Sequence, residues 1–163
     1  MSAPDIRLEP APESDKPALW ALLVAYLTEH TRRVEPERVN YDASAYPYFD
    51  TYWSEGRRGA YWIVSGGERA GFVLINDYSP SGLGTDHAIA EFCILPNARR
   101  SGIGKAAAKA ALQSQPGQWE LQVYRANPDG MPFWPRAIAA AGATGLELIE
   151  HDDRMIYRFR IGA

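Results

Sequence analysis

The stretch from Ala88 to Leu112 constrains the fold of this chain more than any other. Its first half, as far as Leu95, is an apolar run rich in strand-forming residues and is closed by Pro96. Its last half is rich in alanine and repeats apolar residues at the spacing of one helical face. A turn of arginines and glycines, residues 99–104, separates the two halves. The stretch therefore predicts a strand that turns through glycines into a helix.

Such a turn is suited to binding an anion. The first N–H groups of a helix lack intrahelical partners, and the helix dipole adds about half a positive charge at that end. Gly102 and Gly104 would let a phosphate approach the backbone, and Arg99, Arg100 and Lys105 place positive side chains around it. The pattern favours a pyrophosphate site. The simpler alternative is a tight turn with a solvated basic rim.

The spacing of the motif separates three classes of phosphate-binding protein. A dinucleotide fingerprint needs a third glycine where Ala107 stands, and a nucleotide P-loop needs a serine or threonine where Ala106 follows Lys105. What remains is Arg-x-x-Gly-x-Gly starting at Arg99, with Pro96 three residues earlier. This arrangement resembles the acyl-CoA signature of the GNAT superfamily of N-acetyltransferases.

The order of the predicted elements also resembles the GNAT fold. We expect strands at residues 5–9, 60–65, 70–76, 89–95, 119–125, 146–149 and 155–160, and helices from residue 16, within 41–53, and at 103–115 and 136–141. The resemblance implies an α/β (α+β) fold with a mixed, mostly antiparallel central sheet and helices on both faces. It also implies that the fourth and fifth strands splay apart, leaving a cleft for the pantetheine arm of coenzyme A.

The segment from residue 41 to residue 53 is unusually aromatic. It contains Tyr41, Tyr46, Tyr48, Phe49, Tyr52 and Trp53. One interpretation is a second helix packed on the sheet. The other is the wall of a substrate pocket, because aromatic rings with polar tips suit small-ligand sites. The two interpretations are compatible.

The resemblance implies acetyl-CoA as co-substrate and assigns residues to it. The main chain of Phe92, Cys93 and Ile94 would hydrogen-bond the pantetheine amides as an added strand does. The N–H groups of residues 100–105 would hold the pyrophosphate. The predicted CoA-binding residues are Phe92, Cys93, Ile94, Arg99, Arg100, Ser101, Gly102, Ile103, Gly104, Lys105, Asn127 and Trp134.

A second match to the family lies further along the chain. The family often carries an asparagine, a small residue three positions later and then an aromatic pair, here Asn127, Gly130, Phe133 and Trp134. Asn127 would position the pantetheine, cap a turn, or do both. Trp134 departs from the tyrosine that the family commonly uses to protonate the departing thiolate. Because a thiol has a pKa of about 8.5, the thiolate can leave even without an acid.

Acetyl transfer to an amine also needs a base. An amine of pKa about 10.4 is only about 0.04% neutral at pH 7, so a carboxylate or imidazole near the thioester would help. We predict Glu91 in this role, because burial in an apolar strand would raise its pKa. The alternative is a Glu91 side chain on an exposed face. His87 is the second candidate, and Glu120 or Gln122 could order a water.

Composition excludes several classes of function. The chain has 163 residues with 46% hydrophobic and 23% charged residues, which suits a single globular domain over residues 1–163. A net charge of −3 argues against nucleic-acid binding, and we find no signal peptide and no membrane span. The lone Cys93, expected in the core, fits a reducing, cytoplasmic compartment. His30, His87 and His151 are isolated, so no metal site is expected.

Together these features predict an acetyl-CoA-dependent N-acetyltransferase. It would move the acetyl group to a primary amine of a small molecule or peptide by direct transfer in a ternary complex. One alternative is a catalytically degenerate domain that binds acyl-CoA as a sensor or interaction module, which the tryptophan at position 134 would suit. Another is a nucleotide-phosphate-binding protein unrelated to CoA. The sequence does not identify the acceptor, and it is compatible with a monomer or a homodimer.

Overall fold

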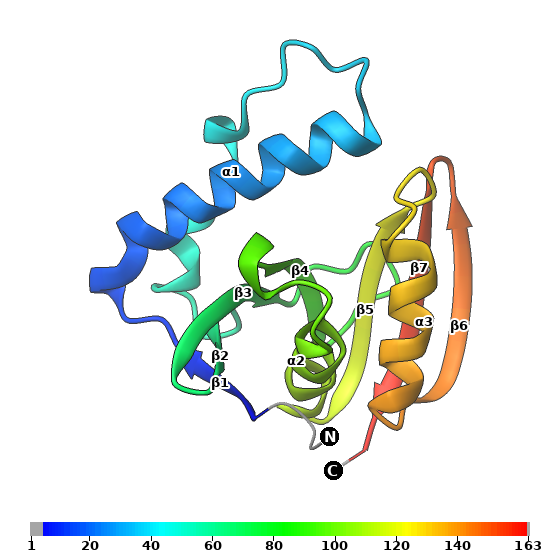
Figure 1. Cartoon of the computed structure of the whole chain (residues 1–163). Helices are drawn as coiled ribbons and strands as arrows, with labels where there is room; N and C mark the ends of the chain where they lie inside the picture. Colours follow the sequence, from blue (N-terminus) through cyan, green and yellow to red (C-terminus); the bar gives the residue numbers. More distant parts are fainter. Residues whose placement is uncertain (1–4, 163) are drawn as a thin grey trace.

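The computed structural model describes residues 5–162 and contains one seven-stranded sheet and three α-helices (Figure 1). The strands are β1 (Ile6–Pro10), β2 (Gly59–Ser65), β3 (Glu68–Asn76), β4 (His87–Ile94), β5 (Gly117–Tyr124), β6 (Thr144–His151) and β7 (Arg154–Ile161). The helices are α1 (Lys16–Val34), α2 (Ile103–Gln113) and α3 (Gly130–Ala140). In the part of the chain that the structure describes, no helix is long and apolar enough to cross a membrane.

The sheet is mixed and mostly antiparallel, as predicted. Its strand order is β1-β2-β3-β4-β5-β7-β6, and each neighbouring pair is antiparallel except β4 with β5. The predicted hairpin of β2 and β3 is confirmed, with Gly66 and Gly67 at positive φ in its turn. Gly71 in β3 is required for another reason. A Cβ at this position would collide with the carbonyl oxygen of Cys93 in β4.

Helices cover both faces of the sheet, which is also as predicted (Figure 1). Because side chains alternate along a strand, Phe72 and Leu74 of β3 pack against α1 on one face, while Val73 and Ile75 pack against α2 and α3 on the other. The helical side chains buried in these two cores are Leu19, Leu23 and Leu27 of α1, Ala107, Ala108, Ala111 and Leu112 of α2, and Trp134, Ala137 and Ile138 of α3.

Two helix predictions are wrong. The aromatic segment forms no second α-helix but two short 3₁₀-helices, Ala43–Ala45 and Phe49–Tyr52, because Pro47 and the left-handed Tyr48 (φ 64°) interrupt it. Conversely, α3 begins at Gly130 rather than near residue 136. Pro132 lies in its first turn, where the missing N–H would have had no intrahelical partner.

Candidate active site

The cleft between β4 and β5 is built into the sheet. These two strands pair only through His87 with Trp119 and Ala88 with Glu120. Beyond these two pairs each strand continues along its other neighbour, β4 along β3 and β5 along β7, but the two no longer contact each other as a ladder. The predicted splay is therefore present, and it opens toward the carboxyl ends of both strands.

The open edge of β4 presents main-chain groups to the cleft. The Leu95 N–H donates to the Ala70 carbonyl of β3 at 2.8 Å. Because main-chain groups alternate along an antiparallel ladder, those of Phe92 and Ile94 point toward β5, whereas those of Cys93 point toward β3. An extended ligand could therefore pair with Phe92 and Ile94 as a strand would.

The loop after β4 holds the start of α2 open. Arg100 (φ 63°) and Gly102 (φ 81°) both adopt left-handed backbone conformations, which turn the chain sharply into the helix. Within residues 5–162, no side chain caps the N-terminus of α2. Its first N–H groups are therefore available to an anion. Gly104, in the first turn, lines the adjacent cavity, and a Cβ there would lie 3.6 Å from Ile94 and Phe133.

The basic residues of this loop have different roles. Arg99 donates through Nε to the Ile94 carbonyl at 2.9 Å and forms an ion pair with Glu29 of α1 at 3.1 Å. Arg100 lines the cavity, whereas Lys105 is exposed beyond it. The Ser101 hydroxyl donates to the Ala98 carbonyl at 2.7 Å and so stabilises the loop. Gly102 and Ile103 form the end of the turn and the start of α2 through their backbone.

Two adjoining cavities follow from this architecture. The first, of about 480 Å³, lies along the open edge of β4 and the loop before α2. Of the predicted CoA residues, it is lined by Phe92, Cys93, Ile94, Arg99, Arg100, Gly104, Asn127 and Trp134. The second, of about 260 Å³, lies between α1, β4, β5 and the aromatic segment, with Glu91 and Tyr46 in its wall. After the roles that the sequence predicts for their lining residues, we name them the CoA cavity and the acceptor cavity.

Glu91 lies in the wall of the acceptor cavity and not on an exposed face. Burial raises the pKa of its carboxyl from 4.5 to about 8, and the neighbouring hydroxyl of Tyr46 partly offsets this rise. A carboxylate with a pKa near the working pH suits general-base catalysis. Cys93, by contrast, is buried and its pKa is raised to about 12, which is consistent with the predicted role in the core.

Asn127 and Trp134 line both cavities. The Asn127 side-chain oxygen accepts from the N–H groups of Asp129 at 3.2 Å and Gly130 at 2.9 Å, so the predicted capping role is confirmed. Trp134 is 9% exposed and packs edge-on against Phe92 and Phe133. Of the aromatic pair in the motif, Trp134 therefore lines both cavities and Phe133 lines the CoA cavity.

Two of the other candidates for proton transfer do not fit. His87 lines neither cavity; its Nε2 lies 3.1 Å from the Pro116 carbonyl and its ring packs on Trp119. Glu120 is fully buried, forms an ion pair with Arg158 at 2.6 Å and accepts from Ser79 and Ser81, so it has no room to order a water. Gln122 does line the acceptor cavity, and Arg154 donates to its side chain at 3.0 Å.

Sequence reasoning missed Tyr26 and His30 of α1, which line both cavities. Tyr46, from the aromatic segment predicted as a pocket wall, lines the acceptor cavity. The spacing of Tyr26 and His30, four residues apart on one helical face, was the available signal. The rings of this pair lie 5.8 Å apart.

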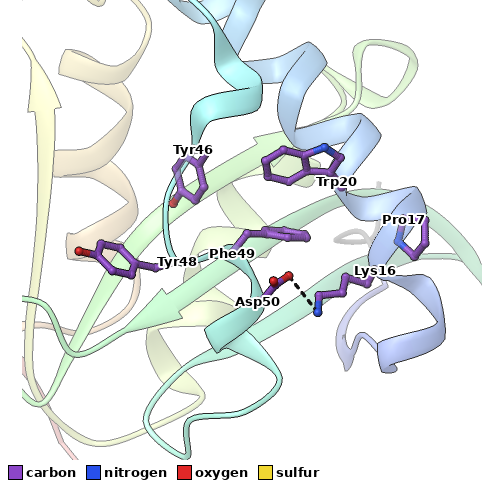
Figure 2. A pocket seen from close by; sticks show the side chains of 7 residues that line it. All are labelled: Lys16, Pro17, Trp20, Tyr46, Tyr48, Phe49 and Asp50. Carbon is purple, nitrogen blue, oxygen red and sulfur yellow. Dashed lines mark ion pairs between the residues drawn. The ribbon is translucent and has the colours of Figure 1, made fainter.

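The aromatic segment also lines a third, more open pocket of about 450 Å³ against the start of α1. Figure 2 shows Trp20, Tyr46, Tyr48 and Phe49 around it, and the ion pair of Lys16 with Asp50 at 2.9 Å beside them. Phe49 and Tyr52 are buried in the core, whereas Tyr46 lines both this pocket and the acceptor cavity. The segment therefore supplies both core and pocket wall. In the described residues, no cluster of three or more His, Cys, Asp or Glu side chains could hold a metal ion.

Comparison with known proteins decides the family. The model of the acetyltransferase (GNAT) family matches residues 20–137. The chain belongs to this family. A search of curated protein sequences found no match.

Solved structures of GNAT proteins share the fold. An acetyltransferase from Thermus thermophilus is 18% identical, with a TM-score of 0.64 over 99% of this chain and 100% of that one. A GNAT acetyltransferase from Streptococcus agalactiae is 12% identical, with a TM-score of 0.67 over 97% and 96%. The spermidine N-acetyltransferase from Vibrio cholerae, solved with CoA and spermine, is 13% identical, with a TM-score of 0.57 over 96% and 94%.

Proposed function

We propose that this GNAT protein is an acetyl-CoA-dependent N-acetyltransferase that acts on a primary amine of a small molecule or peptide. The observation that carries the proposal is the meeting of two cavities at the splayed strands. One runs along an unpaired main-chain edge to an uncapped helix N-terminus, and the other contains a carboxyl whose pKa is raised to about 8. CoA bound to a GNAT neighbour of the same fold supports the choice of co-substrate.

The residues of the first cavity fit coenzyme A. The main-chain groups of Phe92 and the N–H of Ile94 would pair with the pantetheine amides, while the Ile94 carbonyl accepts from Arg99. The N–H groups that open α2, with Arg99 and Arg100, would hold the pyrophosphate. Gly104 lines the same cavity, so a Cβ there would narrow it. Arg99 would exchange part of its contact with Glu29 for the phosphates. Bound acetyl-CoA supplies an activated acetyl group as a thioester.

Glu91 is the base in this proposal. An acceptor arrives as an ammonium ion and must lose a proton before its nitrogen can attack. Glu91, in the wall of the acceptor cavity, takes that proton when its carboxyl is ionised. The aromatic rings of Tyr41, Tyr46 and Tyr124 enclose the acceptor and exclude water.

Two measurements test the proposal. Calorimetric titration with CoA and acetyl-CoA should give binding at micromolar concentration. Release of free thiol should then be followed at pH 8 with a panel of acceptors: a polyamine, an arylalkylamine, a free amino acid and a peptide with a free N-terminus. Failure to bind CoA below millimolar rejects the proposal. Binding without thiol release from any amine instead favours the sensor, which Trp134 would suit.

A further inference from the structure

Five side chains line both cavities and so surround the place where the acceptor nitrogen and the thioester would meet. They are Tyr26, His30, Phe92, Asn127 and Trp134. Phenylalanine, asparagine and the indole of tryptophan do not exchange protons at neutral pH. Tyr26 and His30 are therefore the two residues at the junction that can take part in proton transfer.

The reaction releases two protons from the acceptor, and Glu91 accounts for only one of them. An ammonium ion loses its first proton before attack and its second when the carbon–nitrogen bond forms. The departing sulfur can leave as a thiolate, but a proton delivered to it during bond breaking makes it a better leaving group. Glu91 lines the acceptor cavity but not the CoA cavity, so it is not placed to deliver a proton to the sulfur. That delivery requires a group that reaches both cavities.

The surroundings of His30 suit this task. Its ring lies between those of Tyr26 and Tyr124, with centroids 5.8 and 6.2 Å away. The charged groups nearest to it on α1 are Glu29, Arg33 and Glu35. Other elements that line the same two cavities contribute Arg38, Glu91, Arg99, Arg100 and Asp129. Burial and Arg33 lower the pKa of His30 below 6.5, and the two glutamates only partly oppose this. The imidazole is therefore neutral at pH 7 and able to accept a proton.

Tyr26 cannot play the same part alone. Burial and the nearby Glu91 raise the pKa of its phenol well above the ordinary value of 10.0. The phenol therefore holds its proton throughout the physiological range and cannot first accept one from the nitrogen. A shuttle must do both, and a neutral imidazole, with one nitrogen that accepts and one that donates, can do so.

We propose that His30 carries the second proton from the attacking nitrogen to the departing sulfur. The inference rests on the proposed acetyl transfer. The nitrogen–carbon bond forms and the carbon–sulfur bond breaks, with the bonding pair leaving on sulfur. His30 takes the proton from the nitrogen as the new bond forms and gives it to the sulfur, so that the imidazole ends neutral. The products are the amide and free CoA, and the first proton reaches solvent from Glu91.

The test compares His30→Gln with wild type, and His87→Gln serves as the matched control because His87 lines neither cavity. A second variant, His30→Asn, covers the case in which glutamine disturbs the fold. Calorimetry should give unchanged CoA affinity for His87→Gln and should show that the His30 variants still bind CoA. With the best acceptor of the panel, kcat should fall by about 10²- to 10⁴-fold in both His30 variants and stay unchanged in the control.

The pH profile provides a readout that a purely structural role would not change. In wild type, log kcat should rise with slope 2 at pH values where both His30 and Glu91 are protonated, and with slope 1 above the pKa of His30. In His30→Gln the slope should be 1 throughout the acid range. NMR titration of the His30 ring in the CoA complex should give a pKa below 6.5.

Each outcome decides something. Retention of kcat within threefold in the folded His30 variants, or a His30 pKa above 7 by NMR, overturns the shuttle and leaves the proposed acetyl transfer intact. Normal CoA binding with no transfer by wild type to any amine refutes the acetyl transfer and the shuttle with it. Loss of kcat in the His30 variants together with loss of the second slope supports the shuttle.

Discussion

Replacing Glu91 with glutamine should make the protein more stable and less active. The pKa of Glu91 is about 8 in the folded chain and 4.5 without its surroundings. Between these values the folded state binds more protons than the unfolded state, so the free energy of unfolding falls as the pH rises. Glutamine carries no ionisable group and is free of this loss. The difference between variant and wild type should therefore grow with pH.

The magnitude follows from the two pKa values. Each tenfold fall in proton concentration is worth about 1.4 kcal/mol per proton. From pH 4.5 to pH 7, wild type should lose about 3 kcal/mol relative to Glu91→Gln, and the loss should level off near 5 kcal/mol above pH 8, where the carboxyl ionises in the folded state. A typical domain has about 5–15 kcal/mol of stability, so this difference is easily measured.

Urea denaturation at pH 5, 7 and 8.5, followed by tryptophan fluorescence, is the assay. Glu147→Gln, on the exposed strand β6, is the matched control and should show no pH-dependent gain. In the acetylation assay, Glu91→Gln should lose about 10²- to 10⁴-fold in kcat. Equal stabilities of Glu91→Gln and wild type at all three pH values would refute the burial of the carboxyl on which its role depends.

Three further substitutions test the architecture of the site. Gly104→Ala places a methyl 3.6 Å from Ile94, an ordinary contact, so the melting temperature should be unchanged or higher while calorimetry shows at least tenfold weaker CoA binding. Arg158→Met leaves the fully buried Glu120 without its ion-pair partner and should cost about 3–5 kcal/mol by urea denaturation. Gly71→Ala should cost about 1–3 kcal/mol or more because its methyl meets the Cys93 carbonyl, whereas Gly56→Ala, with open space around it, should be neutral in the same denaturation experiment.

Local patterns predicted the parts of the fold that depend on neighbouring residues. The apolar run of β4, the glycine turn and the alanine-rich α2 all lie within residues 87–113, and their arrangement could be predicted from spacing. Glu91 was placed in the site because it interrupts an apolar strand. The predicted start of α3 is too late because the helix accommodates Pro132 in its first turn and Pro135 in its interior, where the sequence alone favours a break.

The rest of the site depends on contacts between distant segments. His30 lies on α1, some 60 residues before Glu91, and its sequence neighbours give no indication that both face one cavity. The sequence of β5 likewise does not indicate the partners of Glu120. These are Ser79, Ser81 and Arg158, and each is 38 to 41 residues away. Propensity and periodicity describe elements, and neither specifies which side chains meet across them.

The two residue pairs that join β4 to β5 set the shape of the ligand site before any ligand binds. They close the narrow end of the gap between the two strands. Glu120 stabilises this end through its ion pair with Arg158 and its hydrogen bonds to the loop after β3. Because its narrow end is fixed, the gap between β4 and β5 stays open without a bound ligand. The pantetheine arm would then insert into a gap already formed, so its affinity would not be reduced by the free energy of separating two strands.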